Sequence, residues 1–252
     1  MSTPADVTNT IQPRRVPSLE YSALEKVTVP KPVDRIGYVV AAVRGRRVLD
    51  LGALDETAYQ AKGNTGTWLH KEMAQVAAKL IGVDNSKLVP AEGLHLFGTS
   101  GIYLGDINQL APVIDRHGIP EVIVAGEIIE HLPDTLTCLR NLKRDCASGD
   151  PLVIITTPNA CSWHNFVLGL VGRESMHKDH LHVYSYKCLN TLFERAGFRE
   201  WTIRPYNARF TEMIQASTGA KRLATVMFQS LVNFLERRCP MLSGGGVCEI
   251  RL

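Results

Sequence analysis

Acidic residues follow three successive apolar stretches of the sequence, each of which is predicted to be a buried strand. Asp50 lies near the end of the first stretch, Asp84 and Asn85 end the second, and Asp106 follows the third directly. Because the carboxyl ends of parallel strands meet at one edge of a sheet, these side chains are expected to lie together. A carboxylate at Asp84 can accept both hydrogen bonds of a ribose diol, while Asp106 can accept one from an exocyclic amine and Ile107 lies against the ring. The pattern predicts an adenosine pocket, although each acid taken alone is also typical of a helix cap.

A second group of polar residues lies in the stretch 126–133. If this stretch forms a helical turn, Glu127, Glu130 and His131 share one face because they stand at positions i, i+3 and i+4. Two carboxylates and an imidazole can hold a divalent cation, with His180 from a distant stretch as the fourth ligand. Such an ion would grip a diol and lower the pKa of the hydroxyl to be attacked. Without a metal, the candidate bases are His131, His164 and His180, and His180 is favoured because it lies in a polar, histidine-rich segment. Acids such as Glu127 are also common at helix starts for electrostatic reasons alone.

The elements that must position these residues follow from the apolar pattern. Short apolar stretches alternate with amphipathic ones, which is typical of a parallel sheet with helices on both faces. We predict seven strands, near residues 47–52, 80–84, 101–105, 121–125, 151–156, 198–204 and 247–252, with a glycine break at 244–246 before the last. We predict helical segments at residues 34–44, 67–80, 85–97, after 108, and at 133–146, 185–197 and 219–237.

The chain is predicted to form one domain, residues 34–252, preceded by an arm or lid, residues 1–33, that is rich in turn formers. Segment 157–186 interleaves aromatic residues with histidines and is too long for an ordinary loop, which indicates a binding segment or, alternatively, a flap with core aromatics. The apolar stripe of residues 219–237 is typical of helix core or of a dimer face, so a homodimer is one expectation.

Composition narrows the class of protein without identifying a partner. The net charge of +3 over 252 residues is mildly basic, and charge neither indicates nor excludes nucleic acid. The first 17 residues lack the apolar core of a secretory signal, and no stretch approaches the roughly 20 apolar residues of a membrane span. Six cysteines without a CxxC pair predict neither a zinc site nor a disulfide framework. We therefore expect a cytoplasmic protein.

An ordered set of motifs resembles class I S-adenosylmethionine-dependent methyltransferases over roughly residues 45–206. The motifs are Val48-Leu-Asp-Leu-Gly52, Ile81-Gly-Val-Asp84, Gly105-Asp106, Glu121-Val-Ile-Val-Ala-Gly-Glu-Ile-Ile-Glu-His-Leu-Pro133 and Val153-Ile-Ile-Thr-Thr-Pro-Asn159. The resemblance implies an α/β, Rossmann-like, seven-stranded, mostly parallel sheet. It also implies an enzyme that transfers a methyl group from S-adenosylmethionine.

The resemblance assigns parts of the cofactor to parts of the chain. The segment after the first strand, with Asp50 and Gly52, would cradle the methionine end. Asp84 would bind the ribose, with Asn85 beside it, and Asp106 and Ile107 would reach the adenine. The backbone of Ala125 and Gly126 would lie beside the sulfonium, and Glu127 could face the cofactor's ammonium group.

One departure from the family concerns the glycine loop. The family usually has a GxG sequence after its first strand, whereas this chain has Gly52-Ala53-Leu54 and then an insertion-like stretch, 55–66. The following helix start could present Thr67, Trp68 and His70 to the cofactor instead. The departure also leaves open a non-catalytic protein with a degenerate methyltransferase fold.

The Glu-x-x-Glu-His segment is similar to that of small-RNA 2′-O-methyltransferases and of ubiquinone-pathway O-methyltransferases. The first resemblance implies Mg²⁺ or Mn²⁺ at Glu127, Glu130, His131 and His180. The leading hypothesis is methyl transfer to an oxygen or nitrogen of a small organic acceptor. The alternatives are a metal-dependent RNA 2′-O-methyltransferase, a non-catalytic protein, and a nicotinamide oxidoreductase, which would lack its G-x-G-x-x-G fingerprint.

Overall fold

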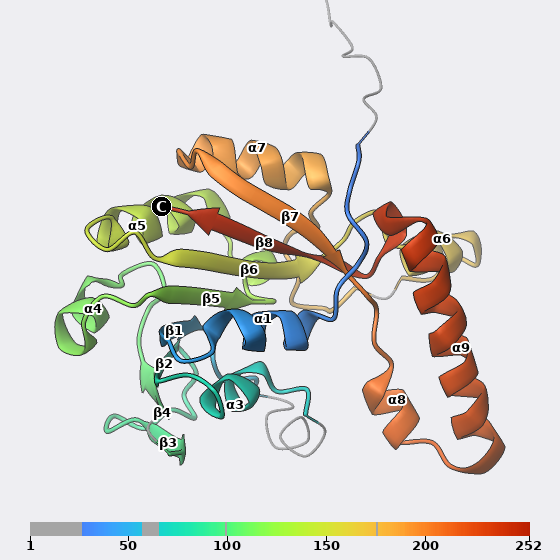
Figure 1. Ribbon diagram of the computed structural model, residues 1–252, viewed down its shortest axis with the longest axis horizontal. Coiled ribbons are helices and arrows are strands. Elements are labelled where there is room, and N and C mark those ends of the chain that lie inside the picture. The colour runs from blue at the N-terminus through green and yellow to red at the C-terminus, as the bar shows by residue number, and fades with distance from the viewer. Residues whose placement is uncertain (1–26, 57–65, 99, 175) are drawn as a thin grey trace, which may run out of the picture.

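The computed structural model describes residues 27–56, 66–98, 100–174 and 176–252. Most of the predicted arm, residues 1–33, and most of the insertion at 55–66 lie outside the described residues. Within the described part, a single sheet runs through the protein, as Figure 1 shows.

The sheet has eight strands in the order β3-β4-β2-β1-β5-β6-β8-β7. The strands are β1 (Arg47–Leu51), β2 (Lys79–Asp84), β3 (Leu94–Phe97), β4 (Ser100–Leu104), β5 (Val122–Gly126), β6 (Leu152–Pro158), β7 (Glu200–Tyr206) and β8 (Gly245–Arg251). β4, β2, β1, β5 and β6 are mutually parallel, whereas β8 runs antiparallel between β6 and β7. The chain builds outward in one direction from β1 and then in the other from β5, so the strand order reverses between these two strands.

Helices cover both faces of the sheet. The described helices are α1 (Arg35–Val43), α3 (Leu69–Ala74), α4 (Ala111–His117), α5 (Thr135–Cys146), α6 (Trp163–Leu170), α7 (Tyr186–Ala196), α8 (Thr211–Gln215) and α9 (Gly219–Arg238), with short 3₁₀ turns η1 (Ile129–His131) and η2 (Pro240–Leu242). Neighbouring strand residues belong to opposite cores: Val48 packs with α1 and α3, and Leu49 packs with α5 and α7. This alternation follows from the two-residue period of a strand, and it confirms the predicted α/β class.

Local signals in the sequence begin and end several helices where predicted. The Asp34 carboxylate accepts the N–H of Gly37 at 2.9 Å and begins α1. Ser185 caps α7 by accepting the N–H of Cys188 at 3.2 Å, and Gly197, with φ of 86°, ends it in the left-handed region. The two capped helices pack into the two different cores of the sheet, α1 on one face and α7 on the other.

Three local predictions were wrong. The stretch 85–97 is not helical, because its end forms β3, an antiparallel edge strand paired with β4. The glycine stretch 244–246 is not a break, because β8 begins at Gly245. The stretch 127–132 is not a full helical turn: the 3₁₀ turn η1 covers only residues 129–131, and Glu127 lies before it with φ of 55°. The strand count is therefore eight instead of seven.

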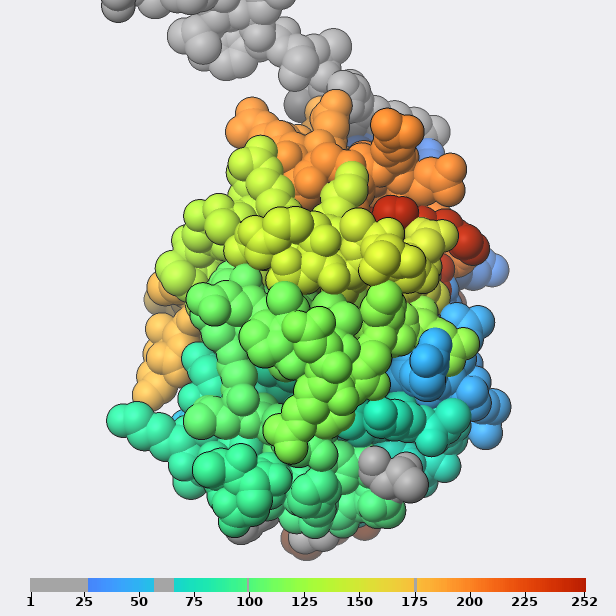
Figure 2. All heavy atoms as spheres, turned by 90° about the vertical axis from the view of Figure 1, so that its left-hand side faces the viewer, coloured from blue at the N-terminus to red at the C-terminus, as the bar shows by residue number. Residues whose placement is uncertain are grey.

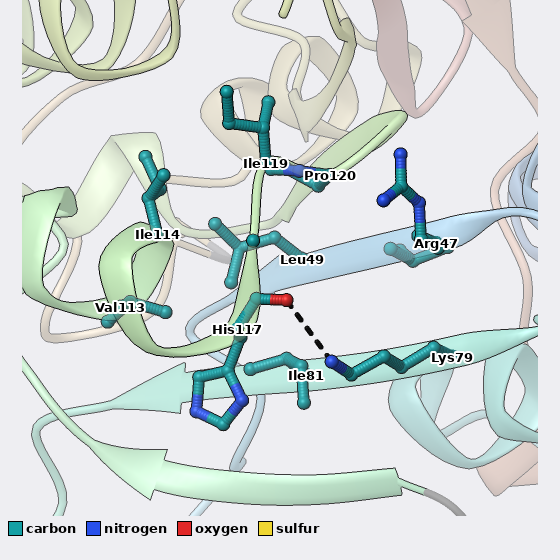
Figure 3. A pocket seen from close by; sticks show the side chains of 11 residues that line it. Arg47, Leu49, Lys79, Ile81, Val113, Ile114, His117, Ile119 and Pro120 are labelled. Carbon is teal, nitrogen blue, oxygen red and sulfur yellow. Dashed lines mark hydrogen bonds between the residues drawn. The ribbon is translucent and has the colours of Figure 1, made fainter.

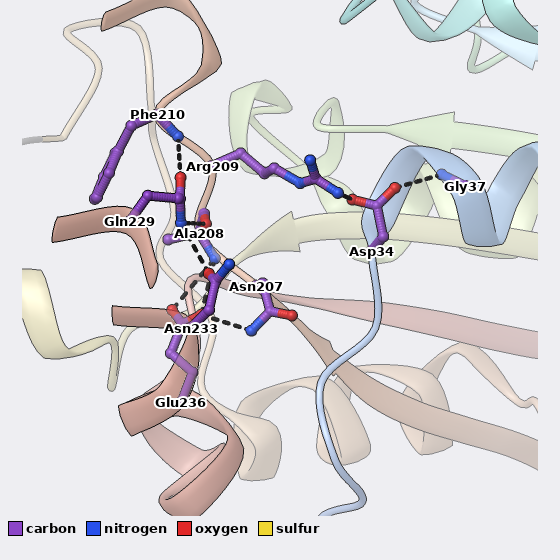
Figure 4. A network of polar contacts seen from close by, with 9 residues as sticks. All are labelled: Asp34, Gly37, Asn207, Ala208, Arg209, Phe210, Gln229, Asn233 and Glu236. Atoms are coloured by element: carbon purple, nitrogen blue, oxygen red, sulfur yellow. Dashed lines mark hydrogen bonds and ion pairs between the residues drawn. The ribbon is translucent and has the colours of Figure 1, made fainter. Parts of the chain in front are cut away.

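The long helix α9 is tied to the loop after β7 along one side, as Figure 4 shows. The buried Glu236 carboxylate accepts hydrogen bonds from Asn207 Nδ2 at 2.8 Å and from the N–H of Ala208 at 3.1 Å. Gln229 Oε1 accepts the N–H of Phe210 at 2.6 Å. The buried residues of α9 are Val232 and Glu236. Among the described helices, none is long and apolar enough to cross a membrane.

The Glu236 carboxyl predicts a pH dependence of stability. Burial raises its pKa above the ordinary value, so the folded state binds this proton more tightly than the unfolded state does. Stability should therefore be lost as the pH rises from about 4.3, the pKa of an unfolded glutamate, through the raised folded value. In urea unfolding, the Glu236→Gln variant should gain stability relative to the original protein with rising pH over this window. A difference that stays constant with pH would contradict the prediction.

Candidate functional site

The carboxyl ends of the five parallel strands meet at one edge of the sheet, which lies to the right in Figure 1. The predicted cofactor residues come from this edge: Asp50 in β1, Asp84 at the end of β2, Asp106 after β4, and Ala125 and Gly126 at the end of β5. The reversal of strand order between β1 and β5 lies in their midst, where sheets of this kind bind ligands.

The opposite edge of the sheet offers a small cavity that is unrelated to these residues. Figure 3 shows it at the amino ends of β1 and β2, lined by Arg47 and Lys79. The Lys79 ammonium already donates to the carbonyl of His117 at 3.1 Å. Figure 2 views this edge, where residues of α4 and α5, in green and yellow-green, form the surface. The chemistry predicted from the sequence belongs at the other edge.

Asp84 ties the loop after β1 to the end of β2. Its side chain is 6% exposed, and its two oxygens accept the N–H groups of Leu54 at 2.8 Å and Ser86 at 2.9 Å. Burial raises the pKa of this carboxyl, while the two backbone hydrogen bonds act in the opposite direction. Each oxygen keeps a second lone pair for a ligand hydroxyl. Asn85, beside it, is exposed.

The loop that departs from the family pattern is packed into the protein. Gly52 has φ of 71°, and a Cβ there would lie 2.7 Å from Ile128, so a glycine is needed. Ala53 is buried, and its carbonyl accepts the indole N–H of Trp68 at 3.0 Å. Trp68 is 6% exposed, so its indole supports the loop from within. The loop is thereby fixed without a second glycine.

A buried carboxylate–imidazole pair lies beside this loop. Asp50 Oδ2 and His70 Nδ1 are 2.8 Å apart, and both side chains are almost completely buried. Burial raises the pKa of Asp50, and His70 opposes that shift. The sequence suggested that His70 could reach a ligand from the start of α3. In the structure, its buried ring pairs with Asp50 instead. This pair joins the start of α3 to β1.

Asp106 is exposed at the end of the neighbouring strand β4. Its Oδ1 accepts the N–H of Asn108 at 2.8 Å and the side-chain amide of the same residue at 2.9 Å. The next helix, α4, begins at Ala111 and has Leu110 as its N-cap residue, so Asp106 is not its cap. Ile107 is half-buried against the core beside it. This carboxylate is accessible at the predicted edge.

Glu127 is held by two residues that the sequence did not indicate. The hydroxyl of Tyr206, at the end of β7, lies 3.0 and 3.2 Å from its two carboxylate oxygens, and Arg35 Nη1 lies 3.8 Å from Oε1. Burial raises the pKa of Tyr206 well above its ordinary value, so its hydroxyl stays protonated and donates. Glu127 itself has a φ of 55°, in the left-handed region that non-glycine residues rarely adopt. No local pattern relates residues 35, 127 and 206.

Glu130 is buried behind Glu127. Its Oε2 accepts the hydroxyl of Thr157 at 3.0 Å, while Oε1 is buried without a hydrogen-bond partner in the described part of the chain. Burial, and after it the charge of Glu127, raises the pKa of Glu130 to about 8. The backbone carbonyl of Glu130 accepts the N–H groups of Leu181 and His182, which anchors the histidine-rich segment against η1.

Three histidines meet at this anchor. The rings of His131 and His180 have centroids 4.6 Å apart, and His177 lies 6.0 and 5.6 Å from them. One ring nitrogen from each lies within 4.8 Å of the others, a spacing that could hold a metal ion. Of the four predicted metal ligands, the structure brings His131 and His180 together. Glu127 and Glu130 are outside this group, and His177 takes a place that was not predicted.

The imidazole of His180 is also suited to accept a proton. Its Nδ1 is buried without a hydrogen-bond partner among the described residues. Burial, then the neighbouring His131 and His177, lowers the pKa of His180 and favours its neutral form. The Nδ1 of His131 is instead 3.1 Å from the carbonyl of Asp179.

Segment 157–186 has core aromatic residues, as the flap alternative predicted, and its binding role stays a prediction. Tyr184 and Tyr186 are buried in the core, and the Tyr184 hydroxyl pairs with that of Thr135 at 2.8 Å. The segment also forms α6, where Phe166 is 68% exposed. Its ends are therefore structural, while its middle faces outward at the carboxyl edge of the sheet.

Comparisons with known proteins agree with this geometry. A family model described as a methyltransferase domain matches residues 31–203. A comparison with curated proteins finds no match. Solved structures of similar fold include an S-adenosylmethionine-dependent methyltransferase from Archaeoglobus fulgidus, with TM-score 0.51 and 17% identity, covering 86% of this chain and 91% of that one.

Two further structures are similar. A possible histamine N-methyltransferase from Thermotoga maritima has TM-score 0.52 and 13% identity, covering 86% of this chain and 87% of that one. The small RNA methyltransferase HEN1 has TM-score 0.53 and 12% identity, covering 90% of this chain but only 27% of that one. At these identities the structural matches show the fold alone.

Proposed function

The chain belongs to the methyltransferase domain family, as its motifs predicted, and we propose that it transfers a methyl group from S-adenosylmethionine to an oxygen or nitrogen of a small organic acceptor. The observation that carries this proposal is the set of carboxylates at adjacent strand ends. Asp84 ends β2 and Asp106 follows β4, the two strands next in order after β1 on one side of the reversal of strand order. This arrangement suits the ribose and the adenine of one nucleoside.

Bound S-adenosylmethionine would supply an activated methyl group. The acceptor's lone pair would form the new bond to the methyl carbon, while the carbon–sulfur bond would break and leave its electron pair on sulfur. The acceptor's proton then passes to a base or to water. His180, with its unpartnered Nδ1, is the residue that we propose as this base, with His131 beside it. Glu127, held by Tyr206, would face the cofactor's ammonium group.

Calorimetric titration of the protein with S-adenosylmethionine and S-adenosylhomocysteine tests the cofactor. Micromolar binding, followed by transfer of labelled methyl to phenols, alcohols or amines, would support the proposal. Absence of binding would favour the non-catalytic alternative, in which the altered loop Gly52-Ala53-Leu54 no longer holds the cofactor.

A metal-dependent O-methyltransferase, including one that acts on an RNA 2′-hydroxyl, is the second candidate. The specific observation in its favour is the cluster of His131, His177 and His180. Within the cluster, the buried Nδ1 of His180 has no hydrogen-bond partner among the described residues and fits a missing ligand. The three histidines would hold the ion, which would lower the pKa of an acceptor hydroxyl. Imidazole donors favour a transition-metal ion over Mg²⁺.

The metal hypothesis predicts a measurable loss in one variant. His177→Ala should weaken the binding of Mn²⁺ in calorimetry by about tenfold or more, because one of three ligand nitrogens is removed. Methyl transfer by the unmodified protein should fall when a chelator is added and recover with Mn²⁺. His95→Ala is the matched control, since His95 lies on β3 and contacts Tyr103 instead. Full activity in the presence of a chelator would contradict the metal hypothesis and support the metal-free mechanism.

A further inference from the structure

Two helices at the carboxyl edge of the sheet expose an unusual amount of apolar side chain. We call this the α6–α9 surface, and each of its large apolar residues is at least 40% exposed. They are Phe166, Val167 and Leu170 of α6, Val171 directly after it, and Leu223, Val226, Met227, Phe228, Leu231, Phe234 and Leu235 of α9. Soluble proteins rarely expose an apolar patch of this extent without a partner for it.

The two helices contact each other at the carboxyl edge of the sheet. The ring of Trp163 in α6 packs edge-on against Phe228 of α9, with centroids 5.9 Å apart. Figure 1 shows both helices beyond the carboxyl ends of β5 and β6. Val232 and Glu236 are the residues that α9 buries against the domain. Leu223, Met227 and Leu231 recur at helical spacing together with Phe234. They therefore project from the side of α9 that faces away from Val232 and Glu236.

The exposed charges of α9 have one sign. The exposed charged residues of α9 are Lys221, Arg222, Arg237 and Arg238, two in its first turn and two in its last. The only acid of this helix, Glu236, is 1% exposed and bonded to the loop after β7. The apolar stripe is thus flanked at both ends by cations.

This charge pattern argues against a second copy of the chain as the occupant. If two copies of α9 packed antiparallel, Lys221 and Arg222 of one would face Arg237 and Arg238 of the other. In a parallel pair each cation would face its own equivalent. Both arrangements bring like charges together, which costs stability. An anionic partner removes this cost.

We propose that the α6–α9 surface docks on an anionic lipid bilayer. At 20 residues, α9 is about 30 Å long and would lie in the interfacial plane, with Met227 and Leu231 among the acyl chains. Its terminal lysine and arginines would reach the headgroups. Because none of the described helices can span a membrane, this contact is a surface contact. The proposal does not depend on the methyl transfer reaction.

Sedimentation of the full chain with vesicles tests the docking. The protein should bind vesicles of phosphatidylcholine mixed with phosphatidylglycerol, and bind much less to phosphatidylcholine alone. The double variant Lys221→Glu, Arg222→Glu should lower partitioning roughly 25-fold or more, since each lost cation weakens binding about fivefold. The double variant Met227→Asp, Leu231→Asp should abolish most of it. Added salt should weaken binding as well.

Matched variants separate specific docking from a change in net charge. Arg195→Glu, Arg199→Glu removes two exposed cations at the other end of the sheet, and its vesicle binding should be close to that of the original protein. Equal loss in this control, or equal binding to both kinds of vesicle, would overturn the proposal. An absence of vesicle binding would also overturn the proposal. If the protein then formed dimers that Met227→Asp, Leu231→Asp dissociates, the occupant would be a second copy; if it bound an acidic protein instead, the occupant would be that protein.

Discussion

Replacing Asp84 with alanine is expected to raise the dissociation constant for S-adenosylhomocysteine by about 10- to 150-fold. Deleting a charged hydrogen-bond acceptor costs about 1.5 to 3 kcal/mol, and each 1.4 kcal/mol is a factor of ten. The carboxylate is positioned for this role because Leu54 and Ser86 each donate one N–H to it and leave lone pairs for a ribose diol. Calorimetric titration of both proteins measures the ratio.

The same substitution frees two buried N–H groups, so a loss of stability must be separated from a loss of contact. Unfolding of each protein by urea measures the loss of stability. The ligand titrations are carried out under conditions in which both proteins are folded. An analogue of S-adenosylhomocysteine without the 2′ and 3′ hydroxyls measures the loss of the contact between Asp84 and the ribose. The original protein should bind this analogue more weakly, whereas Asp84→Ala should not discriminate between the two ligands. Equal discrimination by both proteins would place Asp84 away from the ribose.

The sequence predicted the layers of the fold because its signals for them are local. The buried parallel strand β5 is a continuous apolar run, β1 is apolar except for Arg47 and Asp50, and their helices carry a 3.6-residue period. The caps at Asp34 and Ser185 lie within three residues of the N–H groups that they accept. The family was predicted for a related reason, since its motifs are short segments that follow strands.

Two of the wrong predictions concern strands that depend on pairing with other strands. β3 is a four-residue strand that exists because β4 pairs with it, and a run of that length has no distinctive period. β8 begins in glycines, which predict a break by propensity, yet β6 and β7 pair with it on both sides. In both cases tertiary pairing outweighs local preference.

The candidate site divides along the same line. Asp84 and Asp106 could be found because each acid directly follows an apolar strand. Tyr206 and Arg35 could not, because their contacts with Glu127 join residues 79 and 92 positions apart in the sequence. The position of His177 beside His131 likewise depends on the backbone hydrogen bonds that hold segment 181–182 to Glu130.

Gly245→Ala is expected to destabilise the protein by about 3 kcal/mol, because the added methyl group overpacks a buried contact. Its Cβ would lie 2.1 Å from Cζ of Tyr206, the residue opposite it in the strand pair, and moving that ring would also break the hydrogen bond to Glu127. Gly246→Ala is the matched control: its Cβ would lie 3.5 Å from the nearest side chain, so urea unfolding should detect less than about 1 kcal/mol. Combining Gly245→Ala with Tyr206→Leu should cost less than the two changes add up to, because the smaller side chain removes the clash. Strict additivity would mean that Gly245 is not required by the Tyr206 ring, and that the position of Glu127 is set independently of β8.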